Sequence, residues 1–238
     1  MTNVPFDPAQ LAGSPGEAME ILRKSVFELW DVVNNLTRLR PRCVEHYYVT
    51  IFGSARIQPE TAQYHDIRRL AAELARLGCQ IVTGGGPGLM QAANEGAIEG
   101  DPGDRDGSIG IRVDLPFEQN ANAFVGKVYE HKTFFTRLHH FMQISNAFIV
   151  VPGGIGTTLE LLMVWQLLQV KHMYDTPLIL VGSMWEELVE WASKHMIQSQ
   201  PPLANAKDMT IPRCVTSVDE ALELVREHYR TWQESCHS

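Results

Sequence analysis

The sequence predicts an α/β protein with a Rossmann-like, doubly wound parallel sheet, helices on both faces and an N-terminal helical extension. Short apolar segments alternate with segments of helical periodicity from residue 47 onward. Three of these apolar segments end in glycine-bearing turns, as strands that lead into helices often do. We therefore predict an arm and helix over residues 1–45 and a single nucleotide-binding domain over residues 46–238.

The predicted extension precedes the strand–helix alternation. Residues 1–15 hold three prolines and few large apolar groups, which indicates a loose arm. An amphipathic helix that Pro41 closes is predicted from apolar residues at steps of three and four, namely Met19, Leu22, Val26, Leu29, Val33 and Leu36. We expect this helix to cover a sheet edge or to serve a partner subunit.

The elements of the main body follow from apolar runs and turn residues. Ala147–Val151 is nearly continuous in apolar residues, which is typical of a strand covered on both faces. Strands are expected at Tyr47–Phe52, Gln80–Thr83, Ser108–Val113, Ala147–Val151, Pro177–Val181 and Thr210–Val215. Helices are expected at 61–77, 89–98 and 134–144, from the glycine turn at 153–156 to 172, and at 185–197 and 217–232. Loops are expected at 100–107 and 198–209, and irregular chain is expected at 114–127. Gly78 is expected to stop the first of these helices, and Ser217 with Glu220 to cap the last.

The composition limits which kinds of binding partner and which cellular compartment are expected for this protein. The formal net charge of −8 disfavours a nucleic-acid polymer, although one local pocket can still bind a small anion. The four cysteines form no CxxC pair and are expected to be free thiols. No apolar run reaches the ~18 residues of a membrane span, and the first residues lack a secretory pattern. We therefore expect a cytoplasmic protein with no membrane partner.

The three glycine turns predict a phosphate-bearing ligand. They are Gly53-Ser54-Ala55, Gly84 to Gly88, and Gly153 to Gly156. The carboxyl ends of parallel strands share one edge of the sheet, so we expect the turns to face a common crevice. Each leads into a helix whose unpaired N–H groups favour an anion. No P-loop pattern occurs and no clean GxGxxG, so the turns favour neither a P-loop NTPase nor a dinucleotide cofactor.

The segment Pro152–Glu160 is the most specific of the three. Backbone N–H groups of its turn can surround a phosphate, and the hydroxyls of Thr157 and Thr158 can add donors. Glu160 lies one turn into the following helix. It either compensates the helix dipole or faces a ribose that is held by its 5′-phosphate.

Two motifs resemble those of the LOG-type proteins. Pro152 to Glu160 reads Pro-Gly-Gly-x-Gly-Thr-x-x-Glu, the signature of that family, and Gly84 to Met90 is similar to its glycine-rich motif. Leu115 to Gln119 resembles a stretch of its medium-length bacterial members, and the resemblance covers about residues 47–200. These proteins are nucleoside 5′-monophosphate phosphoribohydrolases, many of which activate cytokinins and many of which were once labelled lysine decarboxylases.

The resemblance implies a reaction and a set of site residues. It implies cofactor-free hydrolysis of the N-glycosidic bond of a purine nucleoside 5′-monophosphate, AMP or a cytokinin ribotide, to free base and ribose 5-phosphate. The catalytic residues would be Arg137, which holds phosphate or ribose or assists the leaving base, and Glu160, which stabilises the oxocarbenium-like charge or orients water. Leu138 replaces a family lysine, and Ser145-Asn146 replaces Ser-Asp. The expected substrate-binding residues are Gly53, Ser54, Gly84, Gly85, Gly86, Gly88, Met90, Glu118, Gly153, Gly154, Ile155, Gly156, Thr157 and Thr158.

A different function is compatible with the same turns. A non-catalytic binder of a nucleotide, or a carrier of molybdenum cofactor, would keep the glycine turns and would need neither Arg137 nor Glu160. A metal site is not expected, because the adjacent His139 and His140 point to different helix faces. A pyridoxal phosphate enzyme needs an activated lysine, and no pattern marks one among Lys127, Lys132 and Lys171. The family precedent implies a homodimer or an assembly of dimers, with the site near the subunit interface.

Overall fold

The computed structural model describes residues 16, 19–28, 45–114 and 121–237. Residues 19–28 are helical and belong to a unit of their own, with Met19, Leu22 and Val26 exposed. The predicted arm at 1–15, the helical positions Leu29, Val33 and Leu36, and Pro41 lie outside the described residues. None of the helices in the described ranges is long and apolar enough to cross a bilayer.

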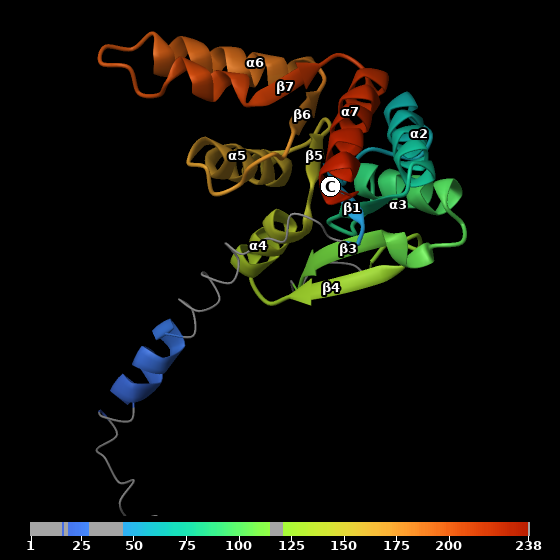
Figure 1. Cartoon of the computed structure of the whole chain (residues 1–238), viewed down its shortest axis with the longest axis horizontal. Helices are drawn as coiled ribbons and strands as arrows, with labels where there is room; N and C mark the ends of the chain where they lie inside the picture. Colours follow the sequence, from blue (N-terminus) through green and yellow to red (C-terminus); the bar gives the residue numbers. More distant parts are fainter. Residues whose placement is uncertain (1–15, 17–18, 29–44, 115–120, 238) are drawn as a thin grey trace, which may run out of the picture. The chain divides into compact units, whose positions relative to one another are not determined.

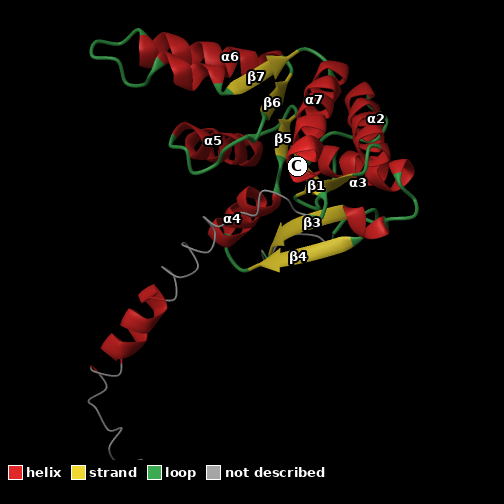
Figure 2. Cartoon of the chain, viewed as in Figure 1, coloured by secondary structure: helices red, strands yellow, loops and turns green. Residues whose placement is uncertain are grey.

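The second unit is built on a seven-stranded sheet in which all neighbouring strands are parallel (Figures 1 and 2). The strands are β1 Tyr47–Phe52, β2 Cys79–Thr83, β3 Ser108–Val113, β4 Lys127–His131, β5 Ala147–Val150, β6 Leu178–Val181 and β7 Pro212–Val215. Their order is β4-β3-β2-β1-β5-β6-β7. The chain therefore builds outward from β1 in one direction and from β5 in the other, which confirms the doubly wound parallel sheet.

Helices cover both faces of the sheet, as expected. They are α2 Ala62–Arg76, α3 Leu89–Gly100, α4 Phe134–Ile144, α5 Ile155–Gln169, α6 Ser183–Ala192 and α7 Val218–His237. One core cluster joins the sheet to α2, α3 and α7, and a second joins it to α4, α5 and α6 (Figure 1). Burial on both sides explains why strands such as β2, β5 and β6 read as nearly continuous apolar runs.

The structure corrects four expectations. Residues 127–131 form the edge strand β4, which pairs with β3 and was not expected from the sequence. The last helix continues past Trp232 to His237, and a short helical turn at Ala206–Thr210 interrupts the expected loop. Cys236 is disulfide-bonded, so the expectation of a free thiol is wrong at this position, whereas Cys79 and Cys214 are free. Cys43 lies outside the described residues.

Local capping explains where the helices begin and end. The Thr61 hydroxyl accepts a hydrogen bond from the Tyr64 N–H at the start of α2. Gly78 adopts a φ of 90° just after this helix, which confirms its expected role as the stop. Ser217 accepts from the Glu220 N–H at the start of α7, and its hydroxyl also contacts the Glu220 carboxylate.

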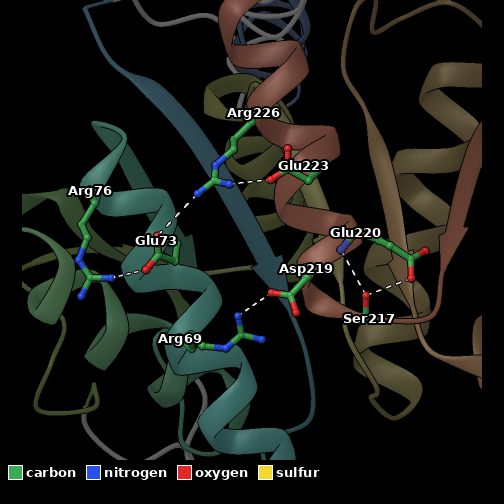
Figure 3. A network of polar contacts seen from close by, with 8 residues as sticks. All are labelled: Arg69, Glu73, Arg76, Ser217, Asp219, Glu220, Glu223 and Arg226. Atoms are coloured by element: carbon green, nitrogen blue, oxygen red, sulfur yellow. Dashed lines mark hydrogen bonds and ion pairs between the residues drawn. The ribbon is translucent and has the colours of Figure 1, made fainter.

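Ion pairs tie α2 to α7 on the surface (Figure 3). Arg69 Nη1 lies 2.5 Å from Asp219 Oδ1, and Arg226 lies 3.6 Å from Glu73 and 2.6 Å from Glu223. All five side chains keep contact with solvent, which screens the charges, so each pair contributes little to stability. The pairs fix the register of two helices that apolar burial already holds against the sheet.

Close packing of α2 against α3 depends on small residues. A Cβ at Gly96 would collide with the Arg68 backbone and lie 3.0 Å from the Ala71 Cβ, and one at Gly100 would lie 2.7 Å from the Ala75 Cβ. The two helix backbones therefore approach each other more closely than side chains at these glycines would allow. This approach places the start of α3, and the glycine turn before it, against β1.

Replacing Gly96 by alanine should lower the free energy of unfolding by about 1–3 kcal/mol, because overpacking forces the helices apart. The loss should exceed the gain of about 1 kcal/mol in helix propensity. Urea unfolding followed by circular dichroism measures it. The matched control is Gly103→Ala, where the nearest atom to a new Cβ is 3.4 Å away, with an expected change within about 0.5 kcal/mol. Equal stability of the two variants would contradict the packing argument.

Candidate active site

The three glycine turns meet at the carboxyl edge of the sheet, beside the point where the strand order reverses between β1 and β5. The Ser54 N–H donates to the Pro152 carbonyl at 3.0 Å, and the Ser54 carbonyl accepts from the Leu89 N–H at 2.9 Å. A Cβ at Gly53 would lie 2.6 Å from Val151 Cγ2. The turn after β1 is therefore bonded to both of the other turns.

The Gly84–Gly88 turn is shaped by close contacts. Gly88 has a φ of 71°, and a Cβ there would collide with the backbone of Ser54 and Ala55. Met90 extends back over the turn, since a Cβ at Gly84 or Gly86 would lie 2.8 or 2.7 Å from its side chain. Glycine is therefore required here by the protein's own packing.

The Gly153–Gly156 turn differs, because part of it is open. A Cβ at Gly153 would meet the Thr157 side chain, whereas nothing lies within 4 Å of a Cβ at Gly154 or Gly156. Residues 154–156 are exposed at the start of α5, where the first N–H groups of a helix have no partner within it. The Thr158 hydroxyl donates to the Gly154 carbonyl at 3.0 Å, and Thr157 is buried. The open N–H groups suit an anion.

Arg137 reaches the same edge from the first turn of α4. Its Nε donates to the Ile111 carbonyl at 2.9 Å, and its Nη1 donates to Glu160 Oε1 at 3.0 Å. The other guanidinium nitrogen lies against Gly84, where a Cβ would overlap it, and the guanidinium carbon is 5.1 Å from the centre of the Phe141 ring. The guanidinium is thus held in place by a backbone carbonyl, a carboxylate and an aromatic face.

Glu160 projects inward from α5 and is buried. The side chains of Arg137 and Glu160 are only 14% and 11% exposed. Burial raises the pKa of the Glu160 carboxyl to about 7, and the attraction of the Arg137 guanidinium opposes the shift. A carboxylate that only compensated the helix dipole would face solvent, so its burial beside Arg137 favours the other interpretation, a group that faces a ligand.

A buried polar network, which the sequence analysis missed, holds the Gly84–Gly88 turn. Asn94 is fully buried, and its Oδ1 accepts from the Thr83 hydroxyl at 2.7 Å and from Asn122 Nδ2 at 3.0 Å. Thr83 in turn accepts from the Gly85 N–H at 2.9 Å, and Asn122 Nδ2 donates to the Gly86 carbonyl at 2.9 Å. An asparagine among the small apolar residues of α3 is the signal that could have revealed it.

The histidines on α4 do not combine into a metal site. His140 Nδ1 lies 2.9 Å from His131 Nε2 on β4, and burial lowers the pKa of His140 to about 4. The Nε2 atom of His139 is buried without a hydrogen-bond partner among the described residues. Within those residues, no group of three His, Cys, Asp or Glu side chains is placed to hold a metal ion.

The remaining predicted positions lie apart from this cluster. Leu138, where the resembled family has lysine, is buried at 8% exposure, so it supplies no cation to the site. Ser145 and Asn146 precede β5, which places them at the opposite, amino edge of the sheet, where Asn146 Oδ1 accepts from the Tyr48 N–H. The predicted ligand Glu118 lies outside the described residues.

Comparison with known proteins gives sequence relatives with a described activity. The pyrimidine/purine nucleotide 5′-monophosphate nucleosidase of Escherichia coli strain K12 is 32% identical over 126 residues, which cover 50% of this chain and 28% of that protein. The chain therefore spans much less than the full length of this relative.

Solved structures share the fold. The molybdenum cofactor binding protein of Rippkaea orientalis aligns with a TM-score of 0.57 and 18% identity, over 78% of this chain and 98% of that one. The molybdenum cofactor carrier protein of Chlamydomonas reinhardtii aligns with a TM-score of 0.54 and 18% identity, over 78% and 99%. At this identity the likeness extends to the fold alone. A family model described as possible lysine decarboxylase matches residues 90–225, which include α3 except for its first residue, α4, α5 and the Arg137–Glu160 pair. Because this match covers more than half of the 238 residues, the chain belongs to that family, the LOG family.

Proposed function

We propose that the protein hydrolyses the N-glycosidic bond of a purine nucleoside 5′-monophosphate, AMP or a cytokinin ribotide, to the free base and ribose 5-phosphate. The observation that carries the proposal is the buried Arg137–Glu160 pair, which lies beside the open N–H groups of the Gly153–Gly156 turn. The Escherichia coli nucleosidase supports the class of reaction, because its similarity to this chain accompanies an activity on nucleotide 5′-monophosphates.

The proposed reaction needs a negative charge near the sugar. As the bond between ribose C1′ and the base nitrogen breaks, positive charge develops on the ribose. The Glu160 carboxylate would stabilise that charge and orient the water whose oxygen bonds to C1′. The water proton passes to the departing base, which leaves neutral. Arg137 would hold the carboxylate in position and contact the phosphate, the ribose or the base.

The substrate phosphate would bind at the start of α5. The helix dipole and the free N–H groups at Gly154, Ile155 and Gly156 favour an anion there, and the Thr157 and Thr158 hydroxyls lie in the same turn. Glu160 follows within two turns of the helix, so a phosphate bound at its start places the ribose toward the carboxylate. The other predicted substrate-binding residues, on the turns after β1 and β2, border this position.

Pyridoxal phosphate does not fit Lys127, Lys132 or Lys171, the three lysines near the proposed site in the sequence. A lysine that forms a Schiff base needs a lowered pKa, which desolvation supplies. The pKa values of Lys127 and Lys132 are instead raised, by the neighbouring Tyr129 and Asp114 respectively. Lys171 is exposed. The description of the family as possible decarboxylases therefore gains no support from these side chains.

We also propose that the protein forms a homodimer through α4 and α5. The outer face of α5 exposes Ile155, Leu159 and Leu162, Val170 is exposed just after this helix, and the first turn of α4 exposes Phe134. Apolar residues thus occupy both the buried and the exposed sides of α5, although a helix at a surface usually has a polar outer face. A second copy of the chain would cover this face and adjoin the site.

The first test measures products. We expect wild-type protein incubated with AMP to release adenine and ribose 5-phosphate, detected by chromatography, and Glu160→Gln to lower kcat by about 10²–10³-fold, since it removes the stabilising charge. Glu187→Gln, which removes an exposed carboxylate on α6, is the control and should keep wild-type activity. Base release by Glu160→Gln at the wild-type rate would refute the mechanism. Nucleotide binding without release of base from any monophosphate would favour the carrier instead.

The second test is pH dependence. Glu160 must be ionised to act, and its pKa is raised to about 7, so kcat/KM should fall as the pH drops below about 7. Two pH units below that value the ionised fraction, and with it the rate, falls about 100-fold. The substrate phosphate also titrates near pH ~6. The phosphate titrates in the same way when the enzyme is the Glu160→Gln variant. The residual activity of that variant should therefore lack the further decrease in kcat/KM that protonation of Glu160 causes in the wild type. A midpoint at the ordinary glutamate pKa of about 4.3 would contradict the structure.

The third test concerns the dimer. Leu162, which is 46% exposed on α5, should be buried between subunits, so Leu162→Glu should convert the dimer to a monomer in sedimentation velocity at micromolar concentration. Met184→Glu places the same charge at an exposed apolar position on α6 and should leave the dimer intact. A monomeric wild-type protein, or equal effects of the two variants, would rule out this interface.

A further inference from the structure

A nucleotide bound as proposed brings more negative charge than the Arg137–Glu160 pair can balance. A phosphate monoester carries a charge of about −1.5 to −2 at neutral pH. The Arg137 guanidinium already pairs with Glu160 at 3.0 Å, so in the reactive form, with Glu160 ionised, the two together add no net positive charge. Leu138 is uncharged, and Lys132 is engaged 2.5 Å from Asp114. The site therefore needs a cation from another segment.

Arg56 is placed to supply it. It follows the turn after β1, two residues beyond Ser54, and its N–H donates to the Ser54 hydroxyl at 3.1 Å. Ser54 is in turn bonded to Pro152, at the start of the phosphate turn, and to Leu89, at the start of α3. The Gln58 side chain donates to the Arg56 carbonyl at 3.1 Å and further fixes this backbone. The residue thus projects from a rigid turn in the centre of the carboxyl edge.

The Arg56 side chain is uncommitted in the described structure. It is exposed, and no hydrogen bond or ion pair of its guanidinium occurs with any part of the chain that the structure describes. By contrast, Arg68, Arg69, Arg76 and Arg226 all pair with carboxylates at the helix surfaces. An unpaired guanidinium offers five donors in a planar fork, which matches two oxygens of a phosphate.

We propose that Arg56 binds the 5′-phosphate of the nucleotide opposite the Gly153–Thr158 turn and is the second cation of the site. The inference rests on the proposed function for the identity of the ligand. Arg56 then supplies a positive charge that the buried Leu138 on α4 does not supply. Backbone N–H groups would contact one side of the phosphate, and the guanidinium would contact the other.

The test separates binding of the phosphate from the reaction. Affinities for ribose 5-phosphate and for ribose are measured by calorimetry, and KM and kcat for AMP are measured in parallel, with wild type, Arg56→Ala and Arg56→Lys. Arg56→Ala should weaken ribose 5-phosphate binding and raise KM about thirtyfold, the usual effect of losing charge-assisted hydrogen bonds. It should change kcat and ribose binding little. Arg56→Lys should restore part of the affinity.

The control is Arg230→Ala, which removes an exposed arginine on α7 and the same charge from the whole protein. It should leave every measurement at the wild-type value. Unchanged ribose 5-phosphate affinity in Arg56→Ala, or an equal loss in Arg230→Ala, would overturn the proposal. If the wild-type protein binds ribose 5-phosphate but releases no base from AMP, the proposed hydrolysis fails while the role of Arg56 is still decided by the binding data. A wild-type protein that binds neither ribose 5-phosphate nor AMP overturns both the proposed hydrolysis and the proposed role of Arg56.

Discussion

The guanidinium of Arg137 and the carboxylate of Glu160 lie 3.0 Å apart with little access to solvent, and neither could be buried alone without a penalty of several kcal/mol. Their pairing requires that the first turn of α4 and the second turn of α5 lie close together at the carboxyl edge of the sheet. Gly84 must be glycine for the same reason, because a side chain there would overlap the guanidinium. The positions of two helices and one turn therefore depend on this pair.

The glycines of the carboxyl edge serve two different needs. Those at 53, 84 and 88 are required by neighbouring protein atoms or by positive φ. Gly154 and Gly156 are not, since a Cβ on either would meet nothing within 4 Å. Packing gives no reason for glycine at these two positions. Close approach of a ligand to the backbone at the start of α5 would give one, and we therefore propose that the phosphate binds there and not at the crowded turn after β2.

Sequence patterns predicted the parallel sheet and the Arg137–Glu160 pair because the signals for them are local. Buried strands are continuous apolar runs, and Glu160 lies within one nine-residue motif. The edge strand β4 escaped because Lys127 and Glu130 face solvent and the strand is defined by its backbone pairing with β3. Asn94 escaped because polarity alone suggests the surface, whereas its partners Thr83 and Asn122 are distant in sequence and bury it. The contacts of Arg56 likewise depend on how three turns meet, which no single segment contains.

The burial of Glu160 bears on the choice between hydrolysis and carriage. A pure carrier of a phosphate-bearing group gains nothing from a carboxylate beside its anion site, since like charges repel and burial of the carboxylate is unfavourable in itself. Hydrolysis of an N-glycosidic bond does gain, because the charge on the sugar turns positive only in the transition state. The protein nevertheless buries the Glu160 carboxylate, and the Arg137 guanidinium donates a hydrogen bond that keeps this carboxylate oriented. This arrangement favours a catalyst of bond cleavage over a protein that merely holds its ligand.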